Sequence, residues 1–326
     1  MATEAAARPT GRAIVISIMK SGTHLMQELM VALGYGIYGQ ARITPDLRPV
    51  LDEATRRRVA ALVLDEKALA ELESSDERGF IEATDRAWRA LAWAWQIRLG
   101  MPLIARYGRA VIETELVEQA RRRSASSDFA ETPSGVCWIL SELDVHKVDG
   151  HFLEEWVCTG EPRIIFNYRD PRDVVLSMIN FLAGRTAQGY GNYNDFAIFN
   201  RILQAKGSLE EQLSYALTDP SFPGYRAYEN ALWLLNHPNV CKVSFEELVG
   251  PQGGGSATAQ LAAVRRVLDF LGSDADPEVL ADRVYRRDAF SFFKGQIGSW
   301  REVFTPQHVE LFRKRSGDVL PLYGYR

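Results

Sequence analysis

The sequence predicts an α/β fold in three layers, with a central, mainly parallel sheet flanked by helices. Short apolar runs rich in β-branched residues alternate with stretches in which apolar residues recur at helical spacing. This alternation is typical of parallel strands joined by helices. The 326 residues, 46% of them apolar and 25% charged, are enough for a substantial core in one large or two ordinary domains. We expect a single domain over residues 1–326, since no linker or internal repeat divides the chain.

The first strand, turn and helix lie near the N-terminus. Residues 13–18 (AIVISI) form a continuous apolar run, as in a strand buried on both faces. Apolar residues then recur at helical spacing from Leu25 to Leu33, and Gly34 stands where a helix would end. The sequence therefore predicts a strand that leads through a short turn, residues 19–22, into a helix.

A second unit of the same kind lies in the middle of the chain. Residues 164–168 form the strand, Asp170 is suited to cap the following helix, and Pro171 fits its first position. Two further strands are predicted at 240–245 and 136–145, and a helix over 261–271 follows the first of them.

Two segments depart from this alternation. Residues of about 42–135 are expected to form a helical variable insertion, with helices over 59–72 and 80–99. The segment of about 184–230 begins with a polar, glycine-rich and aromatic stretch, which predicts a mobile loop that could close over a site.

The composition excludes several classes of protein. The three cysteines, Cys137, Cys158 and Cys241, lie far apart, so a disulfide framework and a zinc site are not expected. No apolar run approaches the roughly 20 residues needed to span a bilayer, and the first twelve residues lack the apolar core of a secretion signal. We expect a soluble, cytoplasmic protein. Its net charge of −4 gives no general attraction to nucleic acid or to a membrane.

The turn between the first strand and the first helix has the chemistry of a phosphate site. It reads Lys20-Ser21-Gly22-Thr23, at a helix N-terminus where free N–H groups and the positive end of the helix dipole attract an anion. It is not a Walker A loop, because the lysine precedes the only glycine. A capped surface helix is the alternative interpretation.

Two other segments suggest contacts to the same kind of ligand. Arg169 lies in the second turn, and Ser177 lies two helical turns beyond Asp170, about 10 Å along the axis. The guanidinium and the hydroxyl could share one phosphate. Late in the chain, residues 293–305 (FKGQIGSWREVFT) combine a lysine with two glycines, as expected of backbone that wraps a ligand; two ordinary turns are the alternative.

Together these motifs resemble one family, the sulfotransferases that use 3'-phosphoadenosine 5'-phosphosulfate (PAPS), especially the cytosolic type and its bacterial small-molecule relatives. Residues 19–25 (MKSGTHL) are similar to the family's PKSGTTW loop, and residues 168–177 (YRDPRDVVLS) to its YRNPKDVxVS motif. Residues 293–305 resemble RKGxxGxWxxxFT, and residues 245–248 (FEEL) resemble YEDL. The likeness is weak between about 40 and 135 and between 184 and 230.

The resemblance implies a P-loop-like fold, PAPS as the sulfuryl donor, and no metal. His24 and Leu25 stand where the family has Thr and an adenine-stacking Trp, so Phe290 is expected to pack on the adenine instead; Phe293 replaces an arginine of the 3'-phosphate site. The residues expected to bind the donor are Ser21, Gly22, Thr23, His24, Leu25, Arg169, Ser177, Phe290, Lys294 and Gly295.

The expected chemistry is an in-line displacement in which charge builds on the leaving oxygen, and Lys20 is the residue expected to stabilise that charge. A histidine would remove the proton of the acceptor. His151, in a GHF segment similar to the GHLP of bacterial relatives, is the first candidate, and His146 is the second. A base at His24, or a reaction without any histidine base, would also be compatible with the sequence.

The acceptor is expected to be a small molecule with a hydroxyl or amine group. Aromatic residues in the variable segments hint at an aromatic or apolar alcohol; they are Trp88, Trp93, Tyr190, Tyr193, Phe196 and Tyr225. Residues 301–306 faintly resemble the dimer segment of the cytosolic family, so a homodimer is one expectation. A P-loop-like nucleotide kinase and a non-catalytic nucleotide-binding protein of the same fold are the alternative functions.

Overall fold

The computed structural model describes residues 9, 11–39, 49–101, 106–107, 110–184, 194–285 and 295–326. The chain divides into two compact units. Unit 1 comprises Met1–Ile14 and Leu33–Arg163, and unit 2 comprises Val15–Ala32 and Ile164–Arg326.

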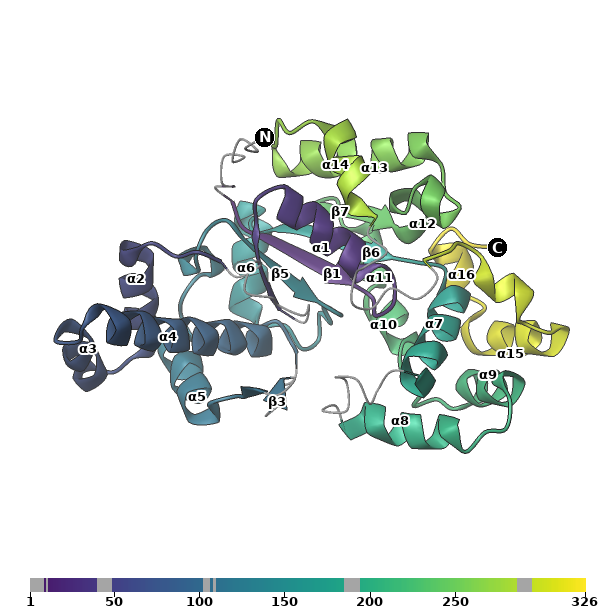
Figure 1. The fold of residues 1–326 in the computed structure, drawn as a ribbon, viewed down its shortest axis with the longest axis horizontal. Coiled ribbons are helices and arrows are strands. Elements are labelled where there is room, and N and C mark those ends of the chain that lie inside the picture. Colours follow the sequence, from purple (N-terminus) through teal and green to yellow (C-terminus); the bar gives the residue numbers. More distant parts are fainter. Residues whose placement is uncertain are drawn as a thin grey trace. The chain divides into compact units, whose positions relative to one another are not determined.

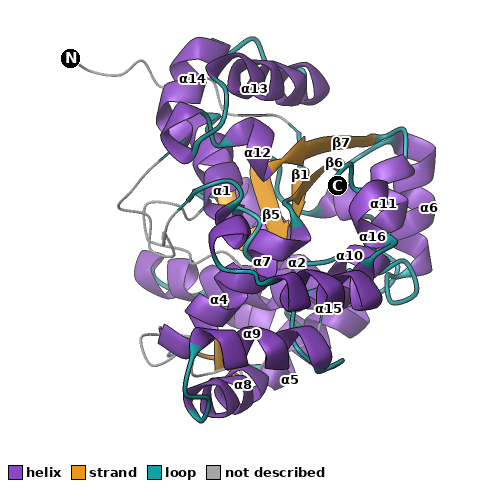
Figure 2. Ribbon diagram, turned by 90° about the vertical axis from the view of Figure 1, so that its right-hand side faces the viewer, coloured by secondary structure: helices purple, strands orange, loops and turns teal. Residues whose placement is uncertain are grey.

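A five-stranded sheet forms the centre of the fold, flanked by helices (Figures 1 and 2). Its strands run in the order β2-β5-β1-β6-β7, and the pairs β2–β5 and β6–β7 are parallel. The strands are β1 (Ala13–Ser17), β2 (Gly36–Gly39), β5 (Val136–Leu140), β6 (Arg163–Tyr168) and β7 (Val240–Ser244). All residues of β1 and β5 are buried, as their continuous apolar sequences predict. The predicted three-layer α/β fold is confirmed.

Unit 1 contains the mostly helical segment expected at about 42–135. Besides β2 and β5, the elements of unit 1 are α2 (Glu53–Val63), α3 (Glu66–Glu73), α4 (Glu77–Arg98), β3 (Arg106–Tyr107), β4 (Ala110–Val111), α5 (Thr114–Arg123), the 3-10 turn η2 (Phe129–Glu131) and α6 (Gly150–Thr159). The expectation of one helix over 59–72 is wrong. The chain breaks at Leu64 because the side chain of Asp65 accepts a hydrogen bond from the N–H of Ala68 and starts a new helix.

Unit 1 has an aromatic core. Trp88 and Trp95 are buried and lie two turns apart on one face of α4. The most buried charged group beside this core is Arg98 at the end of α4, whose guanidinium lies 3.7 Å from the centre of the Trp95 ring. It donates to Asp149 Oδ2 (2.9 Å) and to the carbonyls of Ser124 (2.6 Å) and Ser127 (3.0 Å). Arg98 therefore ties the ends of α4 and α5 to the start of α6.

Unit 2 contains the remaining helices. They are α1 (Thr23–Ala32), α7 (Pro171–Gly184), α8 (Asn194–Gln204), α9 (Leu209–Thr218), α10 (Tyr225–Asn230), α11 (Leu232–Asn236), α12 (Phe245–Leu248), α13 (Ala257–Leu271), α14 (Pro277–Val284), α15 (Pro306–Ser316) and α16 (Val319–Leu322), with the 3-10 turns η4 (Pro251–Gly253) and η5 (Ser299–Glu302). The segment expected as a mobile loop at about 184–230 instead contains α8, α9 and α10 in its described part. Residues 185–193 lie outside the described residues.

The core of unit 2 forms around α7. Buried residues of this helix, among them Phe181 and Leu182, pack with Phe196 and Phe199 of α8 and with Phe312 of α15. These contacts explain why residues 194–204 are helical: Phe196, Phe199 and Leu203 are buried at helical spacing.

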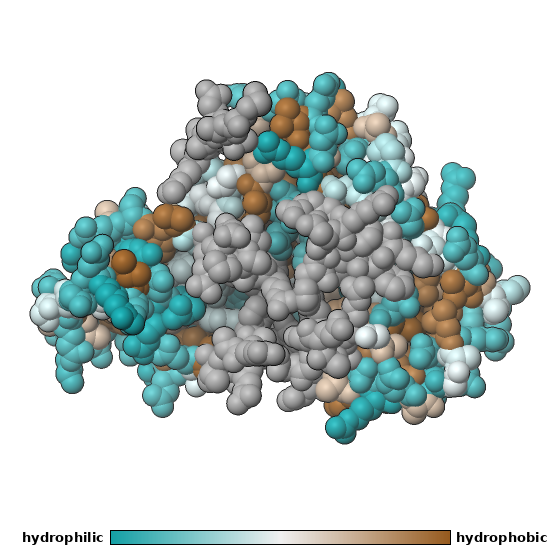
Figure 3. Space-filling view, in the orientation of Figure 1, coloured by the Kyte–Doolittle hydropathy of each residue, from teal (hydrophilic) through white to brown (hydrophobic). Residues whose placement is uncertain are grey.

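The surface shown in Figure 3 is largely hydrophilic over the described residues. Exposed apolar side chains such as Ile81, Val279 and Val309 lie on separate helices. Within the described residues, no helix has both the length and the apolar character needed to cross a bilayer.

Candidate phosphate-binding site

The loop between β1 and α1 has the backbone of an anion site. The N–H of Ser21 donates to the carbonyl of Ile18 (2.9 Å), and α1 begins two residues later, at Thr23. Gly22 has φ +89°, and a Cβ added there would lie 2.7 Å from the ring of Phe245. Glycine is therefore required at this position. The N–H groups of Leu25 and Met26 donate to the carbonyl of Gly22 (2.9 and 3.3 Å), whereas the N–H groups before them have no acceptor within the helix and could meet an anion.

Lys20 has an unusual backbone conformation in this loop. Its φ of 68° makes it the single non-glycine residue with a left-handed backbone among those described. Its carbonyl accepts a hydrogen bond from Nη1 of Arg169 (3.4 Å), and its ammonium lies over the ring of Phe181, 4.4 Å from the centroid. The backbone of Lys20 thus contacts a residue just before α7, and its ammonium contacts a ring in the last turn of that helix.

A buried polar network supports the loop from the sheet. The hydroxyl of Ser17, at the end of β1, donates to Oδ1 of Asn167 on β6 (2.9 Å), and Asn167 Nδ2 donates to the carbonyl of Val243 on β7 (3.2 Å). Since the Ser17 proton goes to Asn167, the hydroxyl of Thr23 donates to Ser17 Oγ (2.8 Å). The hydroxyl proton of Thr23 is therefore already used within the protein.

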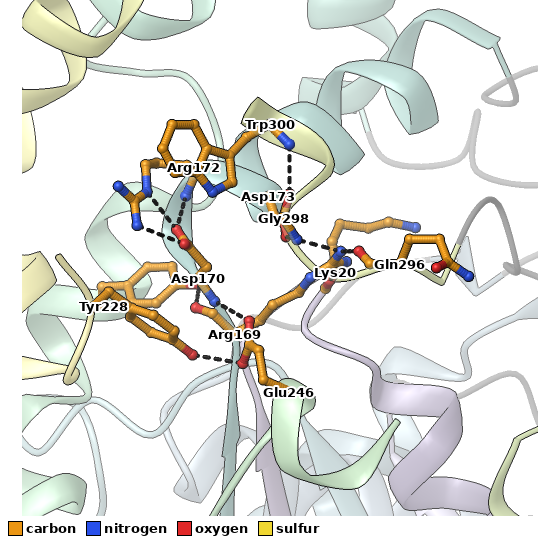
Figure 4. Close-up of polar contacts among 11 residues, drawn as sticks. Lys20, Arg169, Asp170, Arg172, Asp173, Tyr228, Glu246, Gln296, Gly298 and Trp300 are labelled. Atoms are coloured by element: carbon orange, nitrogen blue, oxygen red, sulfur yellow. Dashed lines mark hydrogen bonds and ion pairs between the residues drawn. The ribbon is translucent and has the colours of Figure 1, made fainter. Parts of the chain in front are cut away.

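Arg169 is buried and joins the loop between β1 and α1, residues 18–22, to the segment 295–298 (Figure 4). We call residues 18–22 the phosphate loop, after their predicted role. Nη2 of Arg169 donates to the carbonyl of Gln296 (2.7 Å) and lies 3.4 Å from Oδ2 of Asp173. The guanidinium also lies over the ring of Phe245, 4.1 Å from the centroid. Its Nε is buried and has no hydrogen-bond partner among the described residues, so this atom remains available to an anion.

The first turn of α7 fixes the segment that follows Gln296. The buried carboxylate of Asp173 accepts from the N–H groups of Gly298 (2.7 Å) and Trp300 (2.9 Å). Asp170 pairs with Arg172 through two bonds of 2.9 and 2.7 Å, and the Arg172 guanidinium lies 3.9 Å from the centre of the Trp300 ring. The two acids of this turn therefore have separate partners.

Helix α12, from the FEEL segment, contributes a second support for Arg169. Glu246 accepts from the N–H of Asp170 (3.0 Å) and from the hydroxyl of Tyr325 (2.7 Å), and burial raises the pKa of its carboxyl group. The hydroxyl of Tyr228 donates to the carbonyl of Arg169 (2.7 Å). Backbone and side chain of Arg169 are thus both held.

The structure describes only some of the other residues predicted to bind the sulfuryl donor. Ser177 is half-buried on α7, and the Arg169 guanidinium donates to the carbonyls of Gln296 and Lys20. Leu25 packs against a buried apolar cluster that includes Phe245. Gly295 is described and has φ +59°, whereas Phe290, Phe293 and Lys294 lie outside the described residues.

His24 lies in the first turn of α1. Burial, and to a lesser extent the charge of Lys20, lower the pKa of His24 to about 4. Its imidazole is therefore neutral at pH 7 and is a weak proton acceptor. In the neutral ring, one nitrogen can donate a hydrogen bond and the other can accept one.

The remaining two candidate bases belong to unit 1. His151 lies at the start of α6, and its Nε2 is 2.8 Å from Oδ1 of Asp128. His146 is exposed, and its N–H donates to Oδ1 of Asp144 (3.0 Å).

Three of the six aromatic residues that hint at an apolar acceptor are core residues. Trp88, Phe196 and Tyr225 are buried, Trp93 is half-buried, and Tyr190 and Tyr193 lie outside the described residues. Within the described ranges, no group of three or more His, Cys, Asp and Glu side chains is arranged to hold a metal ion.

Sequence reasoning missed Asp173 and Gln296. The signal for Asp173 was available, because a carboxylate four residues after Arg169 can meet it around the start of a helix. The contact from Gln296 is made by its backbone carbonyl, so no property of its side chain could have identified it.

No protein-family model matches the sequence, and a search of curated proteins finds no match. Solved structures do match. A crystal structure of mouse sulfotransferase SULT7A1 complexed with PAP (adenosine 3',5'-bisphosphate) is similar with a TM-score of 0.50 and 14% identity, over 98% of this chain and 90% of that one.

Two structures of retinol dehydratase are also similar, each over 97% of this chain and 82% of that one. The structure with androsterone and the inactive cofactor PAP has a TM-score of 0.44 and 18% identity, and the structure with retinol and PAP has values of 0.43 and 16%. At such identities the likeness concerns the fold. Together with the α/β architecture and the loop geometry described above, the match to SULT7A1 shows that this chain has the sulfotransferase fold.

Proposed function

We propose that the protein is a sulfotransferase that transfers the sulfuryl group of PAPS to a hydroxyl or amine group of a small-molecule acceptor. The observation that carries the proposal is the junction at Arg169, within a sulfotransferase fold. A buried guanidinium joins the Lys20 loop to the segment that begins with Gly295, so two predicted phosphate-binding segments lie side by side.

The residues fit a ligand with phosphate groups at two ends. A glycine at a helix N-terminus allows close approach of an anion, and the buried Nε of Arg169 has no hydrogen-bond partner within the described part of the chain. In the proposal, Ser21, Gly22, Thr23 and His24 bind the 5'-phosphosulfate end; Arg169, Ser177, Lys294 and Gly295 bind the 3'-phosphate; and Leu25 and Phe290 pack on the adenine. PAPS supplies the sulfuryl group.

Lys20 has the central catalytic role in this proposal. As the bond to the sulfuryl group breaks, negative charge builds on the departing phosphate oxygen, and a preorganised cation at that oxygen lowers the barrier. The ammonium of Lys20 and the first N–H groups of α1 stabilise this charge. No metal ion is part of the proposed mechanism.

His151 is the proposed base, with His146 as the alternative. The contact of 2.8 Å between Asp128 and Nε2 favours the tautomer of His151 with a proton on Nε2, in which Nδ1 accepts the proton of the acceptor. The low pKa of His24 makes it a poor base at neutral pH. We expect His151→Ala to lower kcat by about 100-fold or more. An equal effect of His146→Ala alone would instead assign the base to His146.

The first test is a calorimetric titration with adenosine 3',5'-bisphosphate, with adenosine 5'-monophosphate and with ATP and magnesium. We expect the bisphosphate to bind at least tenfold more tightly than the monophosphate, because only it has the 3'-phosphate. Equal binding, or tighter binding of ATP, would refute the proposal in favour of a kinase or a non-catalytic nucleotide-binding protein. For a protein that passes, Lys20→Ala should abolish sulfuryl transfer without loss of folding.

A further inference from the structure

We propose that Phe181 is a positioning residue for Lys20: the face of its ring holds the lysine ammonium at the phosphate loop through a cation–π contact. The inference rests on the proposed function in one respect, since it gives the contact a role in sulfuryl transfer. The contact itself can be tested without that function.

The geometry joins two elements far apart in the sequence. Lys20 Nζ lies 4.4 Å from the centroid of the Phe181 ring, within the range of about 6 Å over which a ring attracts a cation. A lysine ammonium is a compact charge on a flexible stem, so the backbone alone does not determine where the charge lies. The left-handed backbone of Lys20 directs where the side chain leaves the loop, and the ring selects where it ends.

The ring is itself well fixed. Phe181 is buried on α7, and its ring makes an edge contact with Phe196 of α8, with centroids 5.9 Å apart and planes at 88°. Phe181 also lies four residues after Ser177, on the same face of α7. The cation is thus held beside a helix face that carries a predicted phosphate ligand.

The acids at the start of α7 already have partners of their own. The carboxylate of Asp173 holds Gly298, Trp300 and Arg169, and that of Asp170 holds Arg172. A carboxylate would neutralise the lysine, whereas an aromatic ring attracts the cation and leaves its full charge to act on an anion. A ring is therefore the better support for a lysine that must stabilise charge on a leaving oxygen.

The direct test replaces Phe181 with cyclohexylalanine, which has nearly the same shape but no π-electrons, and with phenylalanines that carry one, two or three ring fluorines. Fluorine withdraws electron density from the ring face and weakens cation–π attraction stepwise. We expect kcat to fall in the order of fluorination, and by about 2- to 30-fold for cyclohexylalanine. The same substitutions at Phe199, a ring of equal burial in the same core, are the matched control and should leave kcat unchanged.

A second measurement does not depend on activity. In the wild-type protein, labelled with 13C at lysine Cε, the ring should shift the Lys20 ε-protons upfield; the signal is assigned with Lys20→Arg, and cyclohexylalanine at position 181 should abolish the shift. The absence of that shift, or a kcat that does not change with fluorination in an active enzyme, would overturn the inference. A protein with the shift but without binding of adenosine 3',5'-bisphosphate would refute the proposed function and support the contact.

Discussion

Replacement of Asp173 should loosen the segment that follows Gln296. The carboxylate is 2% exposed, accepts from two backbone N–H groups, and lies 3.4 Å from the buried guanidinium of Arg169. Asp173→Ala leaves two N–H groups without an acceptor and a buried cation without its carboxylate. Loss of one member of a buried, hydrogen-bonded ion pair costs about 3–5 kcal/mol, so we expect a loss of this size in the free energy of unfolding.

Asp173→Asn keeps the shape and one acceptor oxygen, and should cost less than Asp173→Ala. The measurement is urea unfolding followed by tryptophan fluorescence, with Asp282→Ala, an exposed acid on α14, as the matched control within about 0.5 kcal/mol of wild type. If Asp173→Ala loses less than about 1 kcal/mol, the carboxylate does not hold this segment in solution, and the argument for a fixed junction at Arg169 fails.

Three further changes test separate parts of the structure. Gly253→Ala, whose Cβ would lie 2.5 Å from the carbonyl oxygen of Gly295, should cost about 1–3 kcal/mol in urea unfolding, whereas Gly207→Ala, whose nearest contact is 3.5 Å, should be nearly neutral; equal effects would contradict the tight fit. Because the pKa of His24 is lowered from 6.5 to about 4 on folding, its contribution to stability is complete above pH 6.5 and is lost as the pH falls towards 4, by up to about 3 kcal/mol. His24→Gln should remove this part of the pH dependence, and an unchanged profile would show that His24 is not the group responsible. Arg98→Met should lower the free energy of unfolding of unit 1 by about 3–5 kcal/mol, because it leaves buried acceptors unpaired. The loss would be seen as a thermal transition at lower temperature. A shift smaller than that of a variant at an exposed arginine would argue that Arg98 does not tie α4, α5 and α6 together.

Most of the sheet could be predicted from the sequence because its buried strands are continuous apolar runs. Residues 13–18 and 164–168 correspond closely to β1 and β6, and the predicted cap at Asp170 is present, since its side chain accepts from the N–H of Arg172. The edge strand β2 was missed, because its four residues, GIYG, include two glycines and show no pattern typical of a strand.

The candidate site was predictable as a set of segments but not as a network. Local motifs identify Lys20, Gly22 and Arg169 because phosphate chemistry requires particular residue types there. One partner of Arg169 is a backbone carbonyl 127 residues away, and such a long-range contact depends on packing. The other partner, the carboxylate of Asp173, lies only four residues further along the chain, and its contact could have been predicted. The helices after α7 escape prediction because the polar, glycine-rich beginning of their segment outweighs the apolar spacing that follows.

The left-handed backbone of Lys20 sets stability against activity at this position. For a residue with a side chain that conformation costs about 1–2 kcal/mol, and glycine adopts it without this strain. Lys20→Gly should therefore be as stable as the wild-type protein or more so, by up to about 1 kcal/mol after the greater freedom of unfolded glycine is counted, while Lys20→Ala retains the strain. Selection for stability alone would favour glycine at this position. In the proposed function, the strained backbone is the cost of holding a positive charge at the phosphosulfate end of the donor.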